Sequence, residues 1–155
     1  MGVIFTKSKK EKVIIKLYNS FYEKENLIHD YKFNNDVADA IIVTKKGIFL
    51  FKIFLNESGL TKFNLKDPLW VVDQTLSIEN PIKILNSIKN HILEILNESS
   101  LPVFVCPVFK KLDSDSEDLI FTVKGFRNFI DKLPQVLNND DINEFTKIIK
   151  EDSEK

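Results

Sequence analysis

Residues 37–55 read VADAIIVTKKGIFLFKIFL, two apolar runs separated by the polar turn Thr44–Gly47. Both runs are rich in β-branched and aromatic residues, and Gly47 stands where a tight turn needs it, so we predict two strands that form a β-hairpin. The second strand, Ile48–Leu55, is apolar on both of its faces except at Lys52. Both faces should therefore be covered, as in the central strand of a sheet with helices on each side.

The rest of the chain supplies helices and further strands around this hairpin. Apolar residues at spacings of three and four predict helices, and short apolar runs bounded by turn residues predict strands. In chain order, we predict a helix at 7–25, a strand at 27–33, the hairpin, short strands near 61–65 and 69–72, a helix from Asn80-Pro81 to Asn97, a strand at 102–109, a strand at 119–123, a helix at 126–133 and a last helix that Asp140 or Asp141 caps. This order predicts one α/β domain at 7–150, with a mixed central sheet flanked by helices, between an N-terminal tail at 1–6 and a frayed C-terminal tail at 151–155.

The composition narrows the class of protein. The 155 residues carry a formal net charge of -1, so the whole chain exerts no general attraction on nucleic acid. Arg127 is the single arginine among 22 basic residues, which disfavours phosphate recognition through guanidinium groups. One cysteine, Cys106, excludes a disulfide framework and a cysteine-based zinc site, and no apolar run is long enough to span a bilayer. We therefore expect a soluble protein of the cytoplasm.

Four pieces of the sequence, taken in order, resemble one known family. They are Asp39–Val43, then Gly47–Phe51, then Trp70, then Asn80-Pro81-Ile82 at the start of a helix that contains His91. Over the stretch from Glu11 to Leu133, the chain resembles the nuclease-related domain (NERD) family, a branch of the restriction-endonuclease-like nucleases. The resemblance implies a restriction-endonuclease-like fold with a metal site. In that site an Asp and a Glu on neighbouring strands hold a divalent ion, and a Lys two residues after the Glu assists the attacking water.

The positions that match this site carry different residues here. Asp39 matches the metal-binding Asp, but Lys52 stands at the Glu position and Phe54 at the Lys position, while Glu11 matches a Glu of the first helix. An ammonium group at Lys52 repels a divalent ion, and Phe54 supplies neither charge nor proton. We therefore expect Asp39, Lys52, Phe54 and Glu11 to form a vestigial site without catalysis, metal or cofactor. Since Lys52 needs a partner in an apolar strand, we also predict that its ammonium pairs with Asp39.

These replacements favour a catalytically degenerate domain that serves as a binding or scaffolding module for protein or nucleic acid. The alternative is a metal-dependent nuclease, using Mg²⁺ or Mn²⁺, whose ligands have moved to Asp39, Glu57 and Glu11. The first helix carries a lysine-rich face that is either a partner-binding surface or a solvated surface. Its members are Lys9, Lys10, Lys12 and Lys16.

Three further features have both a structural and a functional interpretation. Met1–Thr6 fits the M-G-x-x-x-[ST] pattern of N-myristoylation, so a membrane partner is expected only if Gly2 is acylated. His91 is either a catalytic base or a residue on the polar side of its helix. Cys106, in an apolar strand, is typical of a buried small side chain. Whether the chain forms a homodimer is left open.

Overall fold

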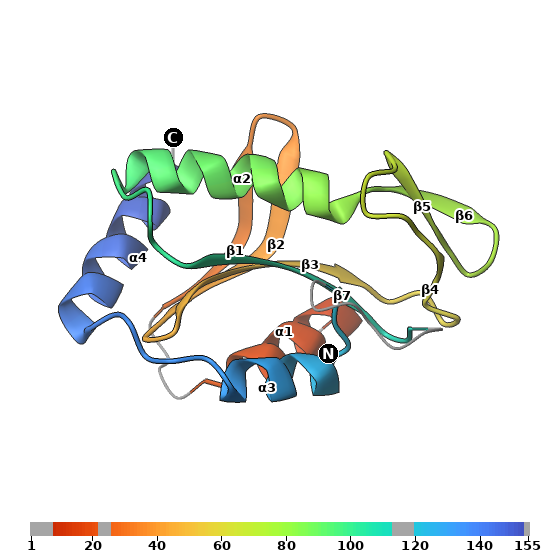
Figure 1. Cartoon of the computed structure of the whole chain (residues 1–155), viewed down its shortest axis with the longest axis horizontal. Helices are drawn as coiled ribbons and strands as arrows, with labels where there is room; N and C mark the ends of the chain where they lie inside the picture. The colour runs from red at the N-terminus through yellow and green to blue at the C-terminus, as the bar shows by residue number, and fades with distance from the viewer. Residues whose placement is uncertain (1–7, 22–25, 113–119, 154–155) are drawn as a thin grey trace, which may run out of the picture.

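A mixed four-stranded sheet forms the centre of the protein (Figure 1). The computed structural model describes residues 8–21, 26–112 and 120–153. The strands lie in the order β1 (Leu27–Phe33), β2 (Asp36–Thr44), β3 (Gly47–Phe54) and β7 (Val103–Phe109). Strands β1, β2 and β3 pair in antiparallel fashion, whereas β7 pairs with β3 in parallel. The predicted α/β class with a mixed central sheet is confirmed.

The β2–β3 hairpin forms where the sequence predicts it. Gly47 has φ 132°, and a Cβ at this position would lie 2.6 Å from the carbonyl oxygen of Pro102, which precedes β7. Thr44 closes the turn, because its Oγ1 donates to the Gly47 carbonyl at 3.0 Å and accepts from the Lys46 amide at 3.0 Å. Residues 48–51 of β3 have no exposed surface. Strand β3 is therefore covered on both faces, as its apolar sequence requires.

Helices cover both faces of the sheet (Figure 1). One face carries α2 (Pro81–Ile95) and α4 (Asn139–Ser153), and the other carries α1 (Lys9–Tyr18) and α3 (Val123–Asp131). Alternate residues of β3 enter the two cores, since Leu50 packs with the residues of α2 and Phe51 packs with those of α1 and α3. In the described part of the chain, no helix has the length and apolar content that crossing a membrane requires.

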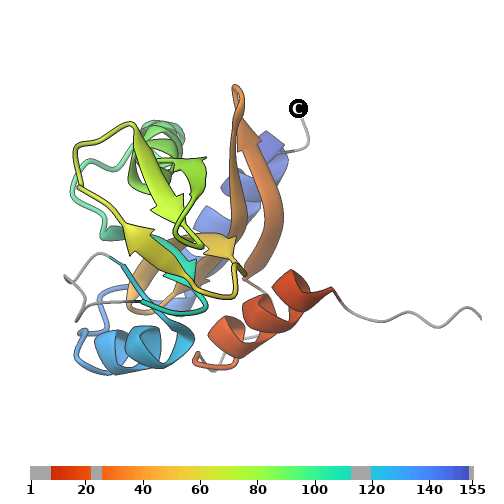
Figure 2. The same cartoon turned by 90° about the vertical axis from the view of Figure 1, so that its right-hand side faces the viewer.

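A second, smaller sheet follows β3 and lies at one end of the molecule, nearest the viewer in Figure 2. It contains β4 (Leu60–Lys62), β5 (Leu69–Val72) and β6 (Leu76–Glu79), all antiparallel. The sequence predicts strands near the first two and misses β6. The reason is the β5–β6 turn, in which Asp73 and Gln74 take positive φ angles of 50° and 69° without any glycine to signal the turn.

Three predicted boundaries are wrong at helix ends. Helix α1 ends at Tyr18 with Asn19 as its C-cap, so Asn26 is no cap; it is buried, and its amide donates to the Val43 carbonyl. The predicted first helix extends to residue 25, and residues 22–25 lie outside the described part. At the other end of the chain, α4 reaches Ser153, past the predicted boundary at residue 150. Its first turn is capped by Asn138, whose Oδ1 accepts from the Asp141 amide at 2.8 Å.

The predicted strand at 119–123 is not formed by its described residues, 120–123, and Leu119 lies outside the described part of the chain. Phe121 forms only an isolated bridge with Val108, and Thr122 then caps α3 by accepting from the Gly125 amide at 3.1 Å. The helix therefore begins at Val123, three residues before the predicted start, and Gly125 lies inside its first turn. A threonine N-cap fixes this boundary because its side-chain oxygen satisfies an amide that the helix leaves without a partner.

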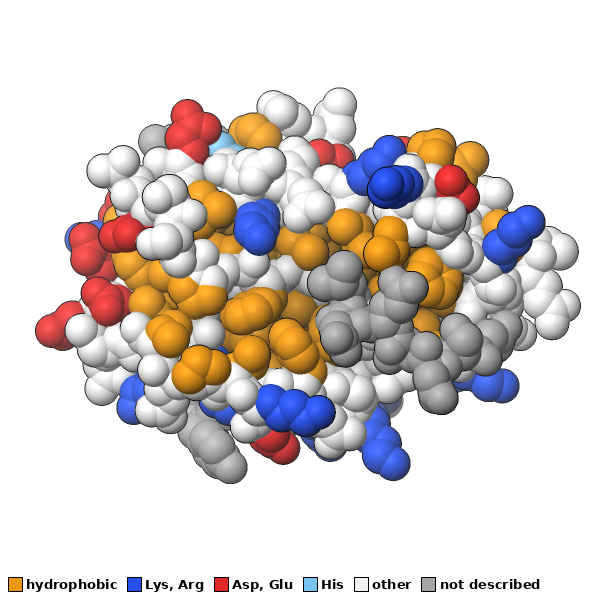
Figure 3. All heavy atoms as spheres, viewed as in Figure 1, with side chains coloured by type: hydrophobic (Ala, Val, Ile, Leu, Met, Phe, Trp, Pro, Cys, Tyr) orange, Lys and Arg blue, Asp and Glu red, His pale blue; other side chains and the backbone are white. Residues whose placement is uncertain are grey.

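On the face seen in Figure 1, hydrophobic side chains form a band between α2 and α3 (Figure 3). The band lies where β7 forms the edge of the central sheet. Phe104 and Val105 of this strand are only partly buried. Two features limit the pairing of another strand with the free edge of β7. Pro107 has no amide hydrogen to donate, and the Phe109 amide already donates to the Phe121 carbonyl at 2.8 Å.

Candidate functional site: a basic groove

Asp39, at the position where the predicted resemblance implies a metal ligand, forms its contacts within the protein on the α1 side of the sheet. Its side chain is 7% exposed. One carboxylate oxygen accepts from the backbone amide of Ile53 at 2.7 Å, and the other accepts from Lys10 Nζ at 3.3 Å. Asp39 thus replaces a missing ladder contact of β3 and attaches α1 to the sheet.

The predicted Asp39–Lys52 pair is wrong. Lys52 Nζ donates instead to the Val37 carbonyl oxygen at 3.0 Å. Lys52 and Phe54 share a small cavity of about 190 Å³ near the start of α2, which is also lined by Asp36, Glu79 and Ile84. Lys52 and Phe54 lie on one face, as the two-residue period of a strand requires, but this is the face opposite to Asp39.

The reason for the separation is an irregularity in β2. Strict alternation would put residues 39 and 41 on the same face. In the protein, Ala38 and Ile41 both pack in the core under α2, whereas Ala40 packs in the core over α1. The facing residue on β1, Asp30, has φ 49°, outside the range of an extended strand. Asp39 is therefore turned toward α1, and no rule of periodicity in the sequence reveals this.

The carboxylates of the alternative nuclease site do not come together. Asp39 binds Lys10, Glu11 lies 3.7 Å from His29 Nδ1, and Glu57 accepts from Lys110 at 2.8 Å. Within the described residues, no three His, Cys, Asp or Glu side chains form a group that could hold a metal ion. Each of the three carboxylates has its own basic partner on a different part of the fold.

A groove of about 440 Å³ lies where the parallel strands β3 and β7 end side by side. Crevices at the carboxyl ends of parallel strands are the usual ligand sites of α/β sheets. This groove runs between α1 and the start of α3. Its floor is apolar and its rim is basic. The floor residues are Val13, Ile53, Phe54, Leu55, Val108, Phe109 and Val123, and the rim lysines are Lys9, Lys12, Lys16, Lys110 and Lys124.

Three of the rim lysines come from α1, where Lys9, Lys12 and Lys16 are spaced by three and four residues and so share one helix face. The fourth lysine of the predicted partner-binding set, Lys10, is directed to Asp39 and does not line the groove. Within the described residues, the three groove lysines of α1 form no ion pair. Among the described acidic side chains, none therefore lies within ion-pair distance of these three ammonium groups.

Glu57 lies beside the groove, where it pairs with the rim lysine Lys110. Its carboxylate is exposed and bound to Lys110. The hydrogen bond from Lys110 lowers the pKa of Glu57, and the positive charges of Lys110 and Lys9 act in the same direction. The Glu57 carboxylate thus forms an ion pair with one rim lysine, Lys110.

The first turn of α3 adds backbone donors to the groove. Thr122 satisfies the amide of Gly125 with its side chain and that of Phe126 with its carbonyl, at 2.9 Å. The amides of Val123 and Lys124 precede these, and helix geometry leaves them without a partner inside the helix. Both residues line the groove. The rim of the groove thus combines lysine side chains with the positive end of a helix dipole.

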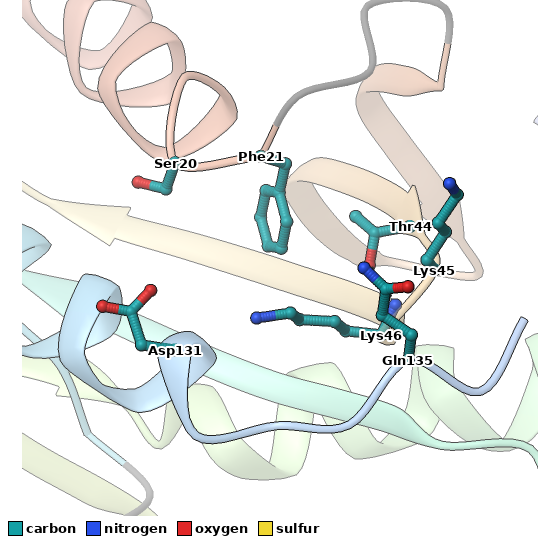
Figure 4. Close-up of a pocket in the computed structure, with 7 residues that line it drawn as sticks. All are labelled: Ser20, Phe21, Thr44, Lys45, Lys46, Asp131 and Gln135. Carbon is teal, nitrogen blue, oxygen red and sulfur yellow. Dashed lines mark hydrogen bonds between the residues drawn. The ribbon is translucent and has the colours of Figure 1, made fainter.

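A second pocket of about 250 Å³ lies between the hairpin turn and the end of α3 (Figure 4). Figure 4 shows the Lys46 side chain reaching from the turn toward the helix end, where its Nζ donates to the Ile130 carbonyl at 2.5 Å. Asp131 and Gln135 line the pocket beside it. The Lys46 ammonium thus satisfies a terminal carbonyl of α3 and ties the hairpin to that helix, which is a structural role.

His91 has a structural environment on α2. Its ring stacks on Phe33 with centroids 4.0 Å apart, and its Nε2 lies 3.0 Å from Asp152 Oδ2. The same oxygen accepts from the hydroxyl of the buried Tyr31 at 2.5 Å. Burial, followed by the hydrogen bond with Asp152, raises the pKa of Tyr31 well above its ordinary value. These contacts attach the last turn of α4 to α2 and β1.

Comparisons of the chain with protein-family models, with curated proteins and with solved structures give no match. The groove is therefore interpreted from its own chemistry. Sequence reasoning found its α1 lysines but missed Lys110 and Lys124. The signal that could have found Lys110 is its position directly after the apolar strand at 102–109, where ligand-binding residues of α/β proteins are expected.

Proposed function

We propose that the protein is a non-catalytic binding module that holds an anionic polymer, nucleic acid or an acidic protein segment, in the basic groove. The observation that carries this proposal is the segregation of charge. Five lysines surround one groove in a chain whose formal net charge is -1, and none of the described residues that line the groove is acidic. Such a concentration of one sign of charge attracts oppositely charged partners even when the whole protein is nearly neutral.

The absence of catalysis is part of the same proposal. A nuclease-related, restriction-endonuclease-like ancestry would place the reactive groups at Asp39, Lys52 and Phe54. The contacts of Asp39 with Lys10 and the Ile53 amide, and the opposite orientation of Lys52, support a lost site. The alternative, an Mg²⁺- or Mn²⁺-dependent nuclease, would need Asp39, Glu57 and Glu11 to leave three separate partners. We place the module in the cytoplasm, where a single buried thiol such as Cys106 suits a reducing environment.

The two remaining partner predictions concern other surfaces. A membrane partner depends on acylation of Gly2, and residues 1–7 lie outside the described part of the chain. A homodimer stays a prediction. The lysine variants described next test the groove by itself.

The test is binding of a fluorescent heparin or oligonucleotide to the full chain and to Lys9→Gln/Lys12→Gln/Lys16→Gln. We expect the triple variant to bind at least about tenfold more weakly, and the slope of log affinity against log salt to fall by about 2, since three phosphate contacts are lost. The matched control is Lys32→Gln/Lys83→Gln/Lys147→Gln, which removes three exposed lysines elsewhere and leaves the same net charge. Equal losses in both triple variants would contradict a role for the groove.

A further inference from the structure

The floor of the basic groove is aliphatic on the side of the sheet that carries the α1 lysines. Three of its side chains are only half-buried, namely Val13 of α1, Leu55 after β3 and Val123 at the start of α3. All three pack with the core that the sheet forms with α1 and α3. Ile53 and Val108 belong to the same core and complete the floor. The groove therefore offers aliphatic surface that an apolar group of a ligand can cover.

The two phenylalanines among the lining residues pack on the opposite face of the sheet. Phe54 and Phe109 stack with ring centroids 4.8 Å apart and belong to the core cluster that contains Trp70. Ile53 and Leu55, on either side of Phe54, pack on the α1 side, as strand alternation requires. Bases of single-stranded nucleic acid bind proteins by stacking on exposed rings. Among the described floor residues, no ring lies on the lysine side to receive a base.

The rim lysines are spread along the groove. Lys9 and Lys16 stand seven residues apart on α1, which is about 10 Å along a helix. Lys110 and Lys124 occupy other elements of the rim, and all of these lysines are exposed. One anionic head group cannot contact lysines this far apart, whereas successive carboxylates of a protein segment can. An extended segment covers the same distance in about three residues and directs alternate side chains to opposite sides.

A lysine–carboxylate pair already exists at this rim, because Lys110 Nζ lies 2.8 Å from Glu57 Oε1. Phosphate recognition commonly uses the planar fork of arginine. The single arginine of the chain, Arg127, does not line the groove. Charge complementarity and the aliphatic floor together favour an acidic protein segment that also carries apolar side chains.

Resting on the proposed binding function, we infer that the ligand is an acidic protein segment in which aliphatic residues alternate with Asp or Glu. Its carboxylates pair with the rim lysines, and its aliphatic side chains cover Val13, Leu55 and Val123. The charges give the complex its salt dependence, while the aliphatic contacts distinguish this segment from other polyanions.

The experiment measures fluorescence anisotropy of two labelled peptides with the full chain. One peptide consists of four Glu-Leu repeats and the other of four Glu-Ser repeats, so they carry the same charge and differ in aliphatic content. An oligo-dT of similar charge and its duplex are the comparison ligands. The protein variants are Val13→Thr/Val123→Thr and the α1 triple Lys→Gln variant. The matched control is Val71→Thr/Val105→Thr, which changes two half-buried valines that do not line the groove.

We expect the Glu-Leu peptide to bind the natural chain at least about tenfold more tightly than the Glu-Ser peptide. Val13→Thr/Val123→Thr should reduce this preference to about threefold or less and leave the affinity for the Glu-Ser peptide unchanged. The control variant should keep the full preference, and the triple lysine variant should weaken both peptides. Melting temperatures show which variants are folded, and the comparison of the two peptides on the natural chain depends on none of them.

Three results would overturn the inference while leaving the binding function intact. They are equal affinity for the two peptides, tighter binding of oligo-dT or duplex than of the Glu-Leu peptide, and an undiminished preference in the folded Val13→Thr/Val123→Thr variant. In each of these cases the triple lysine variant would still bind more weakly. Failure of every polymer to bind would instead refute the proposed function itself.

Discussion

Asp39 contributes to stability through a buried hydrogen bond more than through its charge. Its carboxylate satisfies the amide of Ile53, a residue that is 4% exposed, while its second partner, Lys10, is 45% exposed on its side chain. An unsatisfied buried amide is costly, whereas an ion pair with a partly exposed lysine is screened by solvent. Asp39 thus makes a structural contact in this fold.

We therefore predict that Asp39→Ala lowers the free energy of unfolding by about 1–3 kcal/mol, because the Ile53 amide loses its acceptor. Asp39→Asn keeps an amide oxygen and should lose less. Lys10→Ala, which removes only the ion pair, should cost no more than about 1 kcal/mol. Urea unfolding of the three variants measures these differences. Equal losses for Asp39→Ala and Lys10→Ala would mean that the ion pair dominates.

The contacts of individual side chains were the least predictable feature from the sequence. The α1 lysines could be predicted because a helix face follows from spacing alone. The partner of Lys52 could not, because the face on which Asp39 lies depends on a local irregularity opposite Asp30. Such an irregularity is set by the packing of neighbouring strands, which a single sequence does not display.

At the scale of elements, the hairpin is the feature on which both cores and the groove depend. The two apolar runs of the hairpin and the turn glycine Gly47 made β2 and β3 predictable from the sequence. Sequence reasoning missed the short strand β6 and misplaced the start of α3. The boundaries of both are set by individual turn or capping residues. Asp73 and Gln74 form the β6 turn, and Thr122 caps α3.

We predict that Gly47→Ala destabilises the protein by at least about 2 kcal/mol, since φ 132° is strained for any residue with a side chain. The added methyl group would also collide with the Pro102 carbonyl that leads into β7. Thermal unfolding is the measurement. Gly125→Ala is the control, because Gly125 is helical and a Cβ there lies 3.3 Å from Thr122 Oγ1 only. It should change stability by no more than about 1 kcal/mol, and a similar change for both variants would contradict the prediction.

Across the whole molecule, a nearly neutral total conceals two regions of opposite charge. Acidic side chains gather at the end of the molecule where α4 lies (Figure 3), and α4 itself carries five of them, Asp140, Asp141, Glu144, Glu151 and Asp152. The groove lysines lie at the ends of β3 and β7, beside α1 and α3. The net charge of this chain is therefore a poor guide to its ligands. For the same reason, the composition alone disfavoured nucleic acid as a ligand.

We predict that Glu57→Gln tightens binding of an anionic polymer by about threefold at low salt, because a competing carboxylate leaves the groove rim. The gain should vanish as salt is raised, since exposed charges are screened. The control is Glu98→Gln, which changes the net charge equally at an exposed position away from the groove. Affinity titrations at several salt concentrations measure the effect, and an equal gain in the control would show a general charge effect.

The parallel pairing of β3 with β7 also affects how the protein is made. The groove draws its lysines from positions as distant as Lys9 and Lys124, so its two sides are synthesised on the order of ten seconds apart at common rates of translation. Until the later side leaves the ribosome, the first helix carries its lysines with no floor beneath them. A nascent chain therefore has no complete groove until the residues of α3 have left the ribosome.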